Sequence, residues 1–378
     1  MTFTVSSSLL FSHLQVLSKV INSKNPLPIL DDFLFIIEGG RLTVIASDQE
    51  TTVRCSLDLV EADGDLTLAL PARNLLDCFK EISGQPVRFD VNEDTLEVIL
   101  YYQNGQFAFM ADNGDEFPRM NDTGAPGHLA LPASALLKGI TSTLFASADD
   151  ELRPVMNGVV MDITADDVTF VASDAHKLAR LKYSSFKDEN MEEGAHHLLI
   201  LRKKPLNVLK TLLPKDDGSV DMFFDEKRIV FQYAEYTMAS LLIEGVFPNF
   251  NAVIPKNHPY TIWIDRLSLL SALKRVSVCS DESNNLVKFE IDANALKITA
   301  QNPDFSTSAE ETVVCQYDAD PIAIGFKASF LVDILSNLST SDVILKLADA
   351  ARPGLVLPAE NEEGEEILML LMPMMIKA

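Results

Sequence analysis

The sequence predicts an α+β fold that is dominated by strands and built from three copies of one domain. Short sequence elements recur with a spacing of about 126 residues, and β-rich segments joined by turn residues outnumber the helical segments. The length agrees with this prediction, because 378 residues exceed what one hydrophobic core ordinarily serves and suggest two or three domains.

Three separate elements repeat along the chain. The first is Leu42–Glu50, LTVIASDQE, which returns as Val168–Lys177, VTFVASDAHK, and more faintly as Leu296–Asp304. The second is the segment around Arg73, which returns around Lys203 and Lys327, and the third is a Leu-rich opening at Leu9, Leu136 and Leu269. Because all three keep one order and one period, we expect domains at residues 1–126, 127–254 and 255–378. The joints fall at the polar, turn-like segments 124–128 and 254–259.

Each unit is expected to combine two short helices with antiparallel strands. Apolar residues follow helical spacing at Leu10, Leu14, Leu17 and Ile21, and again at Leu206, Leu209 and Leu213. Asn104-Gly105 lies between two β-rich runs and predicts a hairpin. The runs MFFD and RIVFQYAEYTMASLLI, on either side of Asp225–Arg228, predict another.

The composition is that of a globular protein of the cytoplasm. No apolar stretch reaches the roughly 18 residues of a transmembrane helix, and the N-terminal segment lacks the basic region and cleavage site of a secretory signal. Cys55, Cys78, Cys279 and Cys315 share no metal-like or disulfide-like spacing, so free thiols in a reducing compartment are expected. We therefore expect no membrane association, no metal and no cofactor.

The net charge of −24 argues against nucleic-acid binding only if the charge is spread evenly. It is not, because the six predicted helical segments together carry +10 and the remainder of the chain carries −34. If the helices shared one face, that face would attract phosphates on an otherwise acidic body. The alternative is that helices favour lysine and loops favour acidic residues without any common face.

Several motifs resemble the bacterial DNA polymerase III β subunit, the β sliding clamp family. They are Phe3-Thr4-Val5, Leu27-Pro28-Ile29-Leu30, Leu70-Pro71-Ala72-Arg73, the segment Val171–Ala179, Phe247-Pro248-Asn249-Phe250, Ile254-Pro255-Lys256, Ile298–Pro303 and Met372-Pro373-Met374. The resemblance covers the whole chain in order. It implies three clamp domains with helices inside and antiparallel sheets outside, and a head-to-tail homodimer that forms a six-domain ring around double-stranded DNA.

The resemblance implies a processivity factor that tethers the replicative DNA polymerase and docks the clamp loader and repair proteins through short linear peptides. A basic lining would let the duplex slide without base readout. By position, and together with the basic residues of the predicted helices, the candidate DNA-binding residues are Lys24, Arg73, Lys138, Arg153, Arg202, Lys203, Lys204, Lys274 and Lys327. Solvated surface charge is the alternative for each.

The resemblance also places a hydrophobic cleft for partner peptides on the second and third domains. Its residues would be Met156, Ser173, Ala175, His176, Lys177, Leu178, Pro248, Val253, Pro353, Leu370, Met372, Pro373 and Met374. Methionine suits a groove that receives varied apolar side chains, although LMLLMPMM by composition alone is more typical of a core strand. Ala175, Lys177 and Ala252 depart from the glycine and two arginines common in the family, so the peptide preference is open.

Dimer contacts are implied at Phe107 and Phe109 in the first domain and near Val278 and Cys279 in the third. Phe107 and Phe109 lie on the same face of a predicted strand, where burial in the core is an equally good interpretation.

Two other functional classes have some support in the sequence. An enzyme would have to use Asp174 with His176, or the pair His196-His197, but no nucleophile motif accompanies them and no phosphate-binding or zinc-hydrolase motif occurs. A non-catalytic protein is therefore expected. The second class is a repeat-built peptide-binding scaffold without DNA encirclement, against which the segregated helix charge argues.

Overall fold

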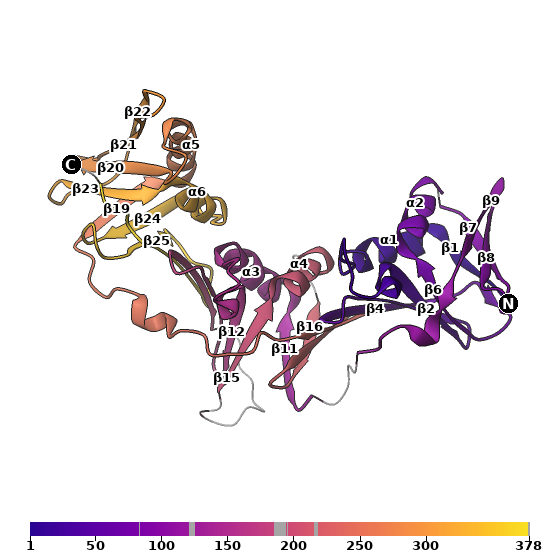
Figure 1. Cartoon of the computed structure of the whole chain (residues 1–378). Helices are drawn as coiled ribbons and strands as arrows, with labels where there is room; N and C mark the ends of the chain where they lie inside the picture. The colour runs from indigo at the N-terminus through magenta and orange to yellow at the C-terminus, as the bar shows by residue number, and fades with distance from the viewer. Residues whose placement is uncertain (83, 121–124, 185–193, 195, 215–217, 377–378) are drawn as a thin grey trace. The chain divides into compact units, whose positions relative to one another are not determined.

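The computed structural model describes residues 1–82, 84–120, 125–184, 194, 196–214 and 218–376. The chain divides into two compact units, one of Met1–Leu137 with Arg202–Leu242 and the other of Lys138–Leu201 with Ile243–Ala378. In each unit, helices pack against antiparallel sheets (Figure 1), which confirms the strand-dominated α+β class. Residue Gly124 of the first predicted joint lies outside the described residues.

All six predicted helices are present. They are α1 (Ser7–Leu17), α2 (Ala72–Glu81), α3 (Ala133–Thr143), α4 (Lys203–Leu212), α5 (Arg266–Val276) and α6 (Ala328–Ser336). Leu10, Leu14 and Leu17 are fully buried, as the spacing predicts, but α1 ends at Leu17 and Ile21 lies beyond it. None of these helices is long and apolar enough to cross a bilayer.

The described residues of the first unit form two sheets. One has five strands in the order β5-β1-β7-β8-β9, and the other has nine in the order β10-β6-β2-β3-β4-β18-β17-β16-β11. Their bounds are β1 (Thr2–Ser6), β2 (Asp32–Glu38), β3 (Arg41–Ser47), β4 (Thr51–Asp58), β5 (Glu61–Ala62), β6 (Leu66–Pro71), β7 (Pro86–Val91), β8 (Glu97–Tyr102), β9 (Gly105–Met110), β10 (Asp112–Asn113), β11 (Gly127–Pro132), β16 (Ser219–Phe224), β17 (Arg228–Tyr233) and β18 (Tyr236–Leu241).

In the second unit, the residues that the structure describes also form two sheets, with the strand orders β15-β12-β13-β14-β26-β25-β24-β19 and β22-β21-β20-β23. Their bounds are β12 (Gly158–Thr164), β13 (Val168–Ser173), β14 (Lys177–Tyr183), β15 (His196–Arg202), β19 (Tyr260–Asp265), β20 (Leu286–Asp292), β21 (Ala295–Asn302), β22 (Thr307–Val314), β23 (Ile322–Lys327), β24 (Asp342–Leu347), β25 (Gly354–Pro358) and β26 (Glu365–Leu371).

Successive sequence repeats are joined by continuous antiparallel sheets. Strand β4 of the first repeat pairs with β18 of the second, which brings Thr52 opposite Ala239. Strand β14 of the second repeat pairs with β26 of the third, which brings Leu178 opposite Leu370. We call these two pairings the first seam and the second seam. The two seams are formed by equivalent strands of successive repeats. Thr52 and Leu178, for example, are 126 positions apart, which is the period of the sequence repeat.

Both predicted hairpins form, but one β-rich run contains a turn that the sequence did not signal. Tyr102 pairs with Gly105 across the β8–β9 turn, and β16 turns into β17 at Asp225. The run that starts at Arg228, however, is divided into β17 and β18 by a turn at Ala234, whose φ of 50° lies in the left-handed region. Alanine rarely marks such a turn, so the sequence predicts a single β-rich run there.

The helices α1 and α4 lie on one face of the nine-stranded sheet (Figure 1). Helix α1 contacts β3, β4, α2 and α4, and the Nδ1 atom of its buried His13 lies 2.6 Å from the Tyr236 hydroxyl of β18. Tyr236 pairs with Cys55, so both side chains face α1. Since side chains alternate along a strand, Thr52, Arg54, Thr237 and Ala239 face the opposite side.

Candidate nucleic-acid and partner interfaces

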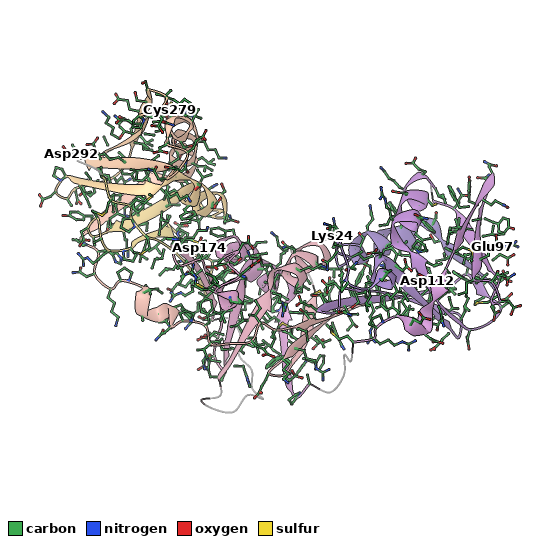
Figure 2. All side chains as sticks on the ribbon, viewed as in Figure 1. Lys24, Glu97, Asp112, Asp174, Cys279 and Asp292 are labelled. Carbon is green, nitrogen blue, oxygen red and sulfur yellow. The ribbon has the colours of Figure 1, made fainter. Side chains whose placement is uncertain are left out.

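Three of the nine candidate DNA-binding residues are exposed and make no ion pair with any described residue. Lys24 follows α1, Arg73 lies in the first turn of α2, and Lys274 lies in the last turn of α5. Figure 2 shows Lys24 on the helix-bearing side of the first unit. Lys327 is half-buried, with its Nζ 4.6 Å from the centre of the Phe330 ring. An exposed cation without an internal partner is the kind that is available to a phosphate.

Other candidates are engaged in internal ion pairs. The Lys138 ammonium contacts Glu365 and lies 2.7 Å from Glu362. Burial alone would lower the pKa of Lys138, but the hydrogen bonds to these two carboxylates outweigh it and raise the pKa. Arg153 Nε lies 2.8 Å from Asp150, and Arg202 Nη1 lies 3.0 Å from Glu50.

Lys204 is held most tightly of the set. Its ammonium donates to the Val20 carbonyl, to the Asp48 carboxylate and to Asn22 Oδ1 at 2.6 Å. These acceptors come from the first repeat, whereas Lys204 belongs to α4 of the second. Lys204 therefore ties two repeats together within the first unit, whereas Lys203 has contacts of its own.

The predicted set omitted three exposed lysines of the same helical surface. Lys80 lies in α2, Lys210 lies in α4, and Lys19 follows α1. These three lysines contribute to the positive charge of the predicted helical segments, although none of them is among the predicted DNA contacts. The α1 helix touches both α2 and α4, so the first unit carries one continuous helical surface, with exposed cations on α2, on α4 and just after α1.

The turn at each seam has one hydrogen-bonding pattern. In the second seam, Ser173 Oγ accepts from the Ala175 amide at 3.1 Å, and Asp174 Oδ1 accepts from the amides of His176 and Lys177, each at 2.8 Å. In the first seam, Ser47 Oγ accepts from the Gln49 amide at 3.2 Å, and Asp48 Oδ1 accepts from the amides of Glu50 and Thr51, at 3.0 and 2.7 Å. The sequence repeat SDxxx is thus a structural repeat of hydrogen bonds.

The chain that follows β26 continues along the turn of the second seam. The Met372 amide donates to the His176 carbonyl at 2.9 Å, and the Met374 amide donates to the Gly325 carbonyl at 2.8 Å. His176, Pro248, Val253 and Met372 are exposed, whereas Pro353, Pro373 and Met374 are half-buried. The predicted C-terminal residues therefore lie beside the predicted residues of the second repeat.

Beneath this exposed set lies one apolar cluster of the second unit. It contains the predicted Met156, Leu178 and Leu370, all less than 9% exposed. It also contains Phe247 and Phe250, which sequence reasoning quoted in the FPNF motif without assigning them to the site. Apolar residues that are buried below an exposed Pro, Val and Met rim form a surface suited to apolar peptide side chains.

Lys177 is buried and turns away from the apolar cluster. Its Nζ lies 2.9 Å from Asp174 Oδ2 and 4.2 Å from the centre of the Phe330 ring. Burial would raise the pKa of Asp174, but the hydrogen bonds from Lys177 and from the turn amides lower it overall. The contribution of Lys177 is thus to hold the turn in place.

Asp174 and His176 do not form a catalytic pair. The Asp174 carboxylate accepts from the backbone amide of His176, whereas the His176 ring stacks at 6.2 Å on Phe330. His196 Nε2 lies 2.5 Å from Asp162, but both lie at the surface, with the His196 side chain 54% exposed. Within the described ranges, no three His, Cys, Asp or Glu side chains are grouped to hold a metal ion.

The candidate dimer residues lie at two outermost strands. Phe107 and Phe109 are half-buried on β9, the last strand of the five-stranded sheet, and Phe107 stacks on Tyr102 at 5.5 Å. Val278 is 82% exposed and Cys279 is half-buried, in the turn after α5 that packs on β22. Strand β22 is the last strand of the four-stranded sheet.

Known proteins resemble the chain along its whole length. Models for the N-terminal, central and C-terminal domains of the DNA polymerase III beta subunit match residues 1–121, 130–249 and 251–374. The beta sliding clamp of Pseudomonas putida is 28% identical over 371 residues, covering 98% of this chain and 99% of the relative. That of Synechococcus elongatus is 28% identical, covering 97% and 96%.

Solved structures agree with the sequence comparison. The crystal structure of the DNA polymerase sliding clamp from Pseudomonas aeruginosa matches with a TM-score of 0.92 and 26% identity, over 100% of both chains. A sliding clamp from Bartonella birtlesii matches with the same TM-score and 28% identity, also over 100% of both chains. The three repeats are therefore three clamp domains, and the chain belongs to the family of the DNA polymerase III beta subunit, the beta sliding clamps.

Proposed function

We propose that this chain is a DNA sliding clamp that closes as a head-to-tail pair of copies around duplex DNA. The observation that carries the proposal is the use of the repeats. In the first seam β4 pairs with β18, and in the second seam the equivalent strands β14 and β26 pair. Each of these two kinds of strand occurs once more, in the outer repeats of the chain. Strand β22 is the equivalent of β4 and β14 in the third repeat, and β9 is the equivalent of β18 and β26 in the first repeat.

A pairing of β22 with β9 of a second copy would repeat the seam a third time. Unpaired edge strands expose backbone donors and acceptors, which favours such strand addition. Two copies would each provide one β9 and one β22, so two identical pairings would close the assembly without leaving these edges open. At 41.7 kDa per chain, the closed pair would have a mass of about 83 kDa.

Exposed cations on or beside the helices of each unit would supply the DNA interface. Lys24, Arg73 and Lys274 are exposed without an internal acidic partner among the described residues, whereas Lys138, Arg202 and Lys204 are partly neutralised. Phosphate attraction by a few free cations on an acidic chain supports sliding rather than site-specific binding. No bond needs to be made or broken in this function, so the chain acts without catalysis.

The second-seam cluster and its exposed rim would bind short linear peptides of the replicative polymerase, the clamp loader and repair proteins. Buried Met156, Leu178 and Leu370 lie under an exposed rim that includes Val253 and Met372, which supports apolar anchoring of such peptides. We place the domain boundaries at residues 1–126, 127–254 and 255–378, and the protein in the cytoplasm.

The DNA proposal is tested by reversing the free cations. The triple variant Lys24→Glu, Arg73→Glu and Lys274→Glu should lose retention on nicked circular duplex while it still binds polymerase. The matched control is Arg41→Glu, Lys227→Glu and Lys256→Glu, because these exposed residues lie off the helices and change the charge equally. Normal retention of the first triple would contradict the DNA interface and favour a peptide-binding scaffold.

A further inference from the structure

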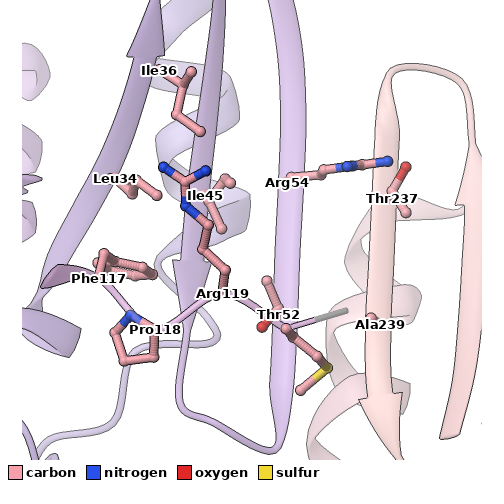
Figure 3. Close-up of a pocket in the computed structure, with 11 residues that line it drawn as sticks. Leu34, Ile36, Ile45, Thr52, Arg54, Phe117, Pro118, Arg119, Thr237 and Ala239 are labelled. Atoms are coloured by element: carbon pink, nitrogen blue, oxygen red, sulfur yellow. The ribbon is translucent and has the colours of Figure 1, made fainter. Parts of the chain in front are cut away.

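A pocket opens on the first seam, on the side of the sheet opposite α1. It has a volume of about 220 Å³ and lies between β2, β3, β4, β18 and the segment 117–120. Figure 3 shows its apolar floor of Leu34, Ile45 and Phe117, with the Arg119 guanidinium above it and the Arg54 side chain extended toward Thr237. It lies entirely within the first unit and away from the proposed DNA surface.

The pocket corresponds by repeat to the apolar cluster of the second seam. Its floor residue Ile45 is equivalent to Val171, and Phe117 is equivalent to Phe247, both in the second cluster. Leu34 likewise corresponds to Val160. The floors of the two sites are therefore equivalent, because they are built by the same strands of successive repeats.

The pocket is open because the first seam has small side chains where the second has leucines. Thr52 pairs with Ala239, whereas the equivalent pair in the second seam is Leu178 with Leu370. Thr237, opposite Arg54, likewise stands where the second seam has Leu368. Each of these exchanges removes methyl groups from the seam, and the removed volume becomes the pocket.

The size of the pocket fits one side chain rather than a whole small-molecule ligand. A cavity of roughly 150 Å³ already holds a benzene-sized group, while sites for drug-sized ligands begin near 300 Å³. At about 220 Å³, this pocket accepts one leucine- or phenylalanine-sized group.

The charge of the pocket favours an acidic neighbour for that apolar group. Arg54 and Arg119 both line it, on a chain whose net charge is −24. Arg119 is exposed and makes no ion pair within the described part of the chain, and Figure 3 shows its guanidinium extended over the floor. Guanidinium groups bind carboxylates by paired, charge-assisted hydrogen bonds.

We propose that this pocket is a second peptide-binding site, which takes one apolar side chain of a short extended peptide and binds an adjacent carboxylate through Arg54 and Arg119. The class of occupant rests in part on the proposed function, because the equivalent second-seam cluster is the proposed partner site. The location and the carboxylate preference rest on the pocket itself.

The test uses an amidated hexapeptide, SDLDSS, whose leucine is replaced by photo-leucine, with SNLNSS as the neutral probe. Cross-links from the acidic probe are expected in residues 34–54 and 117–120 of the full chain, with affinity roughly tenfold above that of the neutral probe. Cross-links confined to the region of Met156, Leu178 and Met372, or equal affinity for the two probes, would overturn the proposal.

Two variants separate this site from the second seam. The double variant Arg54→Gln with Arg119→Gln should lower the affinity for the acidic probe roughly tenfold and leave cross-linking near Met372 unchanged. Arg41→Gln, on the end of β3, is the matched control and should have no effect. Met372→Glu should reduce peptide binding at the second seam alone. Failure of the proposed peptide binding at the second seam is therefore distinguishable from failure of binding at the first-seam pocket.

A charge exchange keeps the proposal testable if the double variant folds poorly. Arg119→Glu should bind the basic probe SKLKSS more tightly than the acidic one. An unchanged preference for the acidic probe in Arg119→Glu would refute a role for this arginine.

Discussion

Asp32 is a buried carboxyl group whose surroundings oppose ionisation. Burial, the charge of Asp112 with a hydrogen bond between the two carboxyls, and the charge of Asp31 together raise the pKa of Asp32 to about 7. The unfolded value lies near 3.9. The protonated carboxyl thus stabilises the folded state fully below pH 4, and this contribution is lost as the pH rises towards 7.

Asp32→Asn should therefore stabilise the protein at pH 8 by about 2 to 4 kcal/mol and have little effect at pH 4. The neutral amide keeps a donor toward Asp112 but cannot ionise. Urea unfolding at both pH values measures the difference, with Asp58→Asn, whose side chain is 92% exposed, as the control. An equal effect at the two pH values would show that ionisation of Asp32 is not the cause.

Ala175 occupies a backbone conformation that favours glycine. Its φ is 75°, and the repeat-equivalent Gln49 has a φ of 74°, so the turn imposes the left-handed conformation at both seams. A side chain with a Cβ atom costs roughly 1 kcal/mol there, partly offset by the greater freedom of glycine in the unfolded chain.

We expect Ala175→Gly to raise the free energy of unfolding by about 0.5 kcal/mol. The control is Ala295→Gly, in strand β21, which should lower it by roughly as much or more. Both are measured by chemical denaturation, and destabilisation by Ala175→Gly would show that the turn does not strain alanine.

The pairing of individual charged residues is not predictable from the sequence. A list of basic residues does not reveal that Lys204 is bound to Asp48 while Lys24 is free of ion pairs within the described ranges. Partner choice depends on which loops meet in space, and Asp48 is 156 positions away from Lys204. The residue types of the proposed DNA surface were predictable, but their pairing was not.

At the scale of elements, Lys204 acts as a link between repeats. Lys204→Met should lower the free energy of unfolding by about 2 kcal/mol, because it leaves the buried Asp48 carboxylate without its cation. Lys210→Met, at an exposed position of the same helix, should change stability by less than about 0.5 kcal/mol. Equal effects of the two substitutions in denaturant unfolding would contradict the structural role of Lys204.

Helices and most strands could be predicted because their patterns are local. Leu10, Leu14 and Leu17 follow one helix face, and Asn104-Gly105 marks a tight turn. The turn at Ala234 could not be predicted, because no glycine, proline or asparagine interrupts the run. The pocket of the first seam was missed for a different reason: Thr52 and Ala239 become neighbours only through strand pairing.

In the whole ring, the proposed closure depends on β9 and β22, the edge strands that remain beside the two seams. Val278→Asp should weaken the pairing of two copies roughly tenfold to a hundredfold, because this side chain is 82% exposed near β22 and its charge would be buried in the interface. Val246→Asp, at a residue 89% exposed, is the matched control. Sedimentation over a dilution series measures both, and unchanged dimer affinity in Val278→Asp would place the interface elsewhere.

Enclosure of DNA by the chain is tested by the release of the protein when the DNA is linearised. The protein is loaded on nicked circular duplex by its clamp loader, the salt is raised to suppress phosphate attraction, and the circle is then cut once. We predict that the protein stays on the intact circle and leaves the cut DNA by sliding off its ends. Equal retention on the two forms, or equal loss from both at high salt, would contradict encirclement.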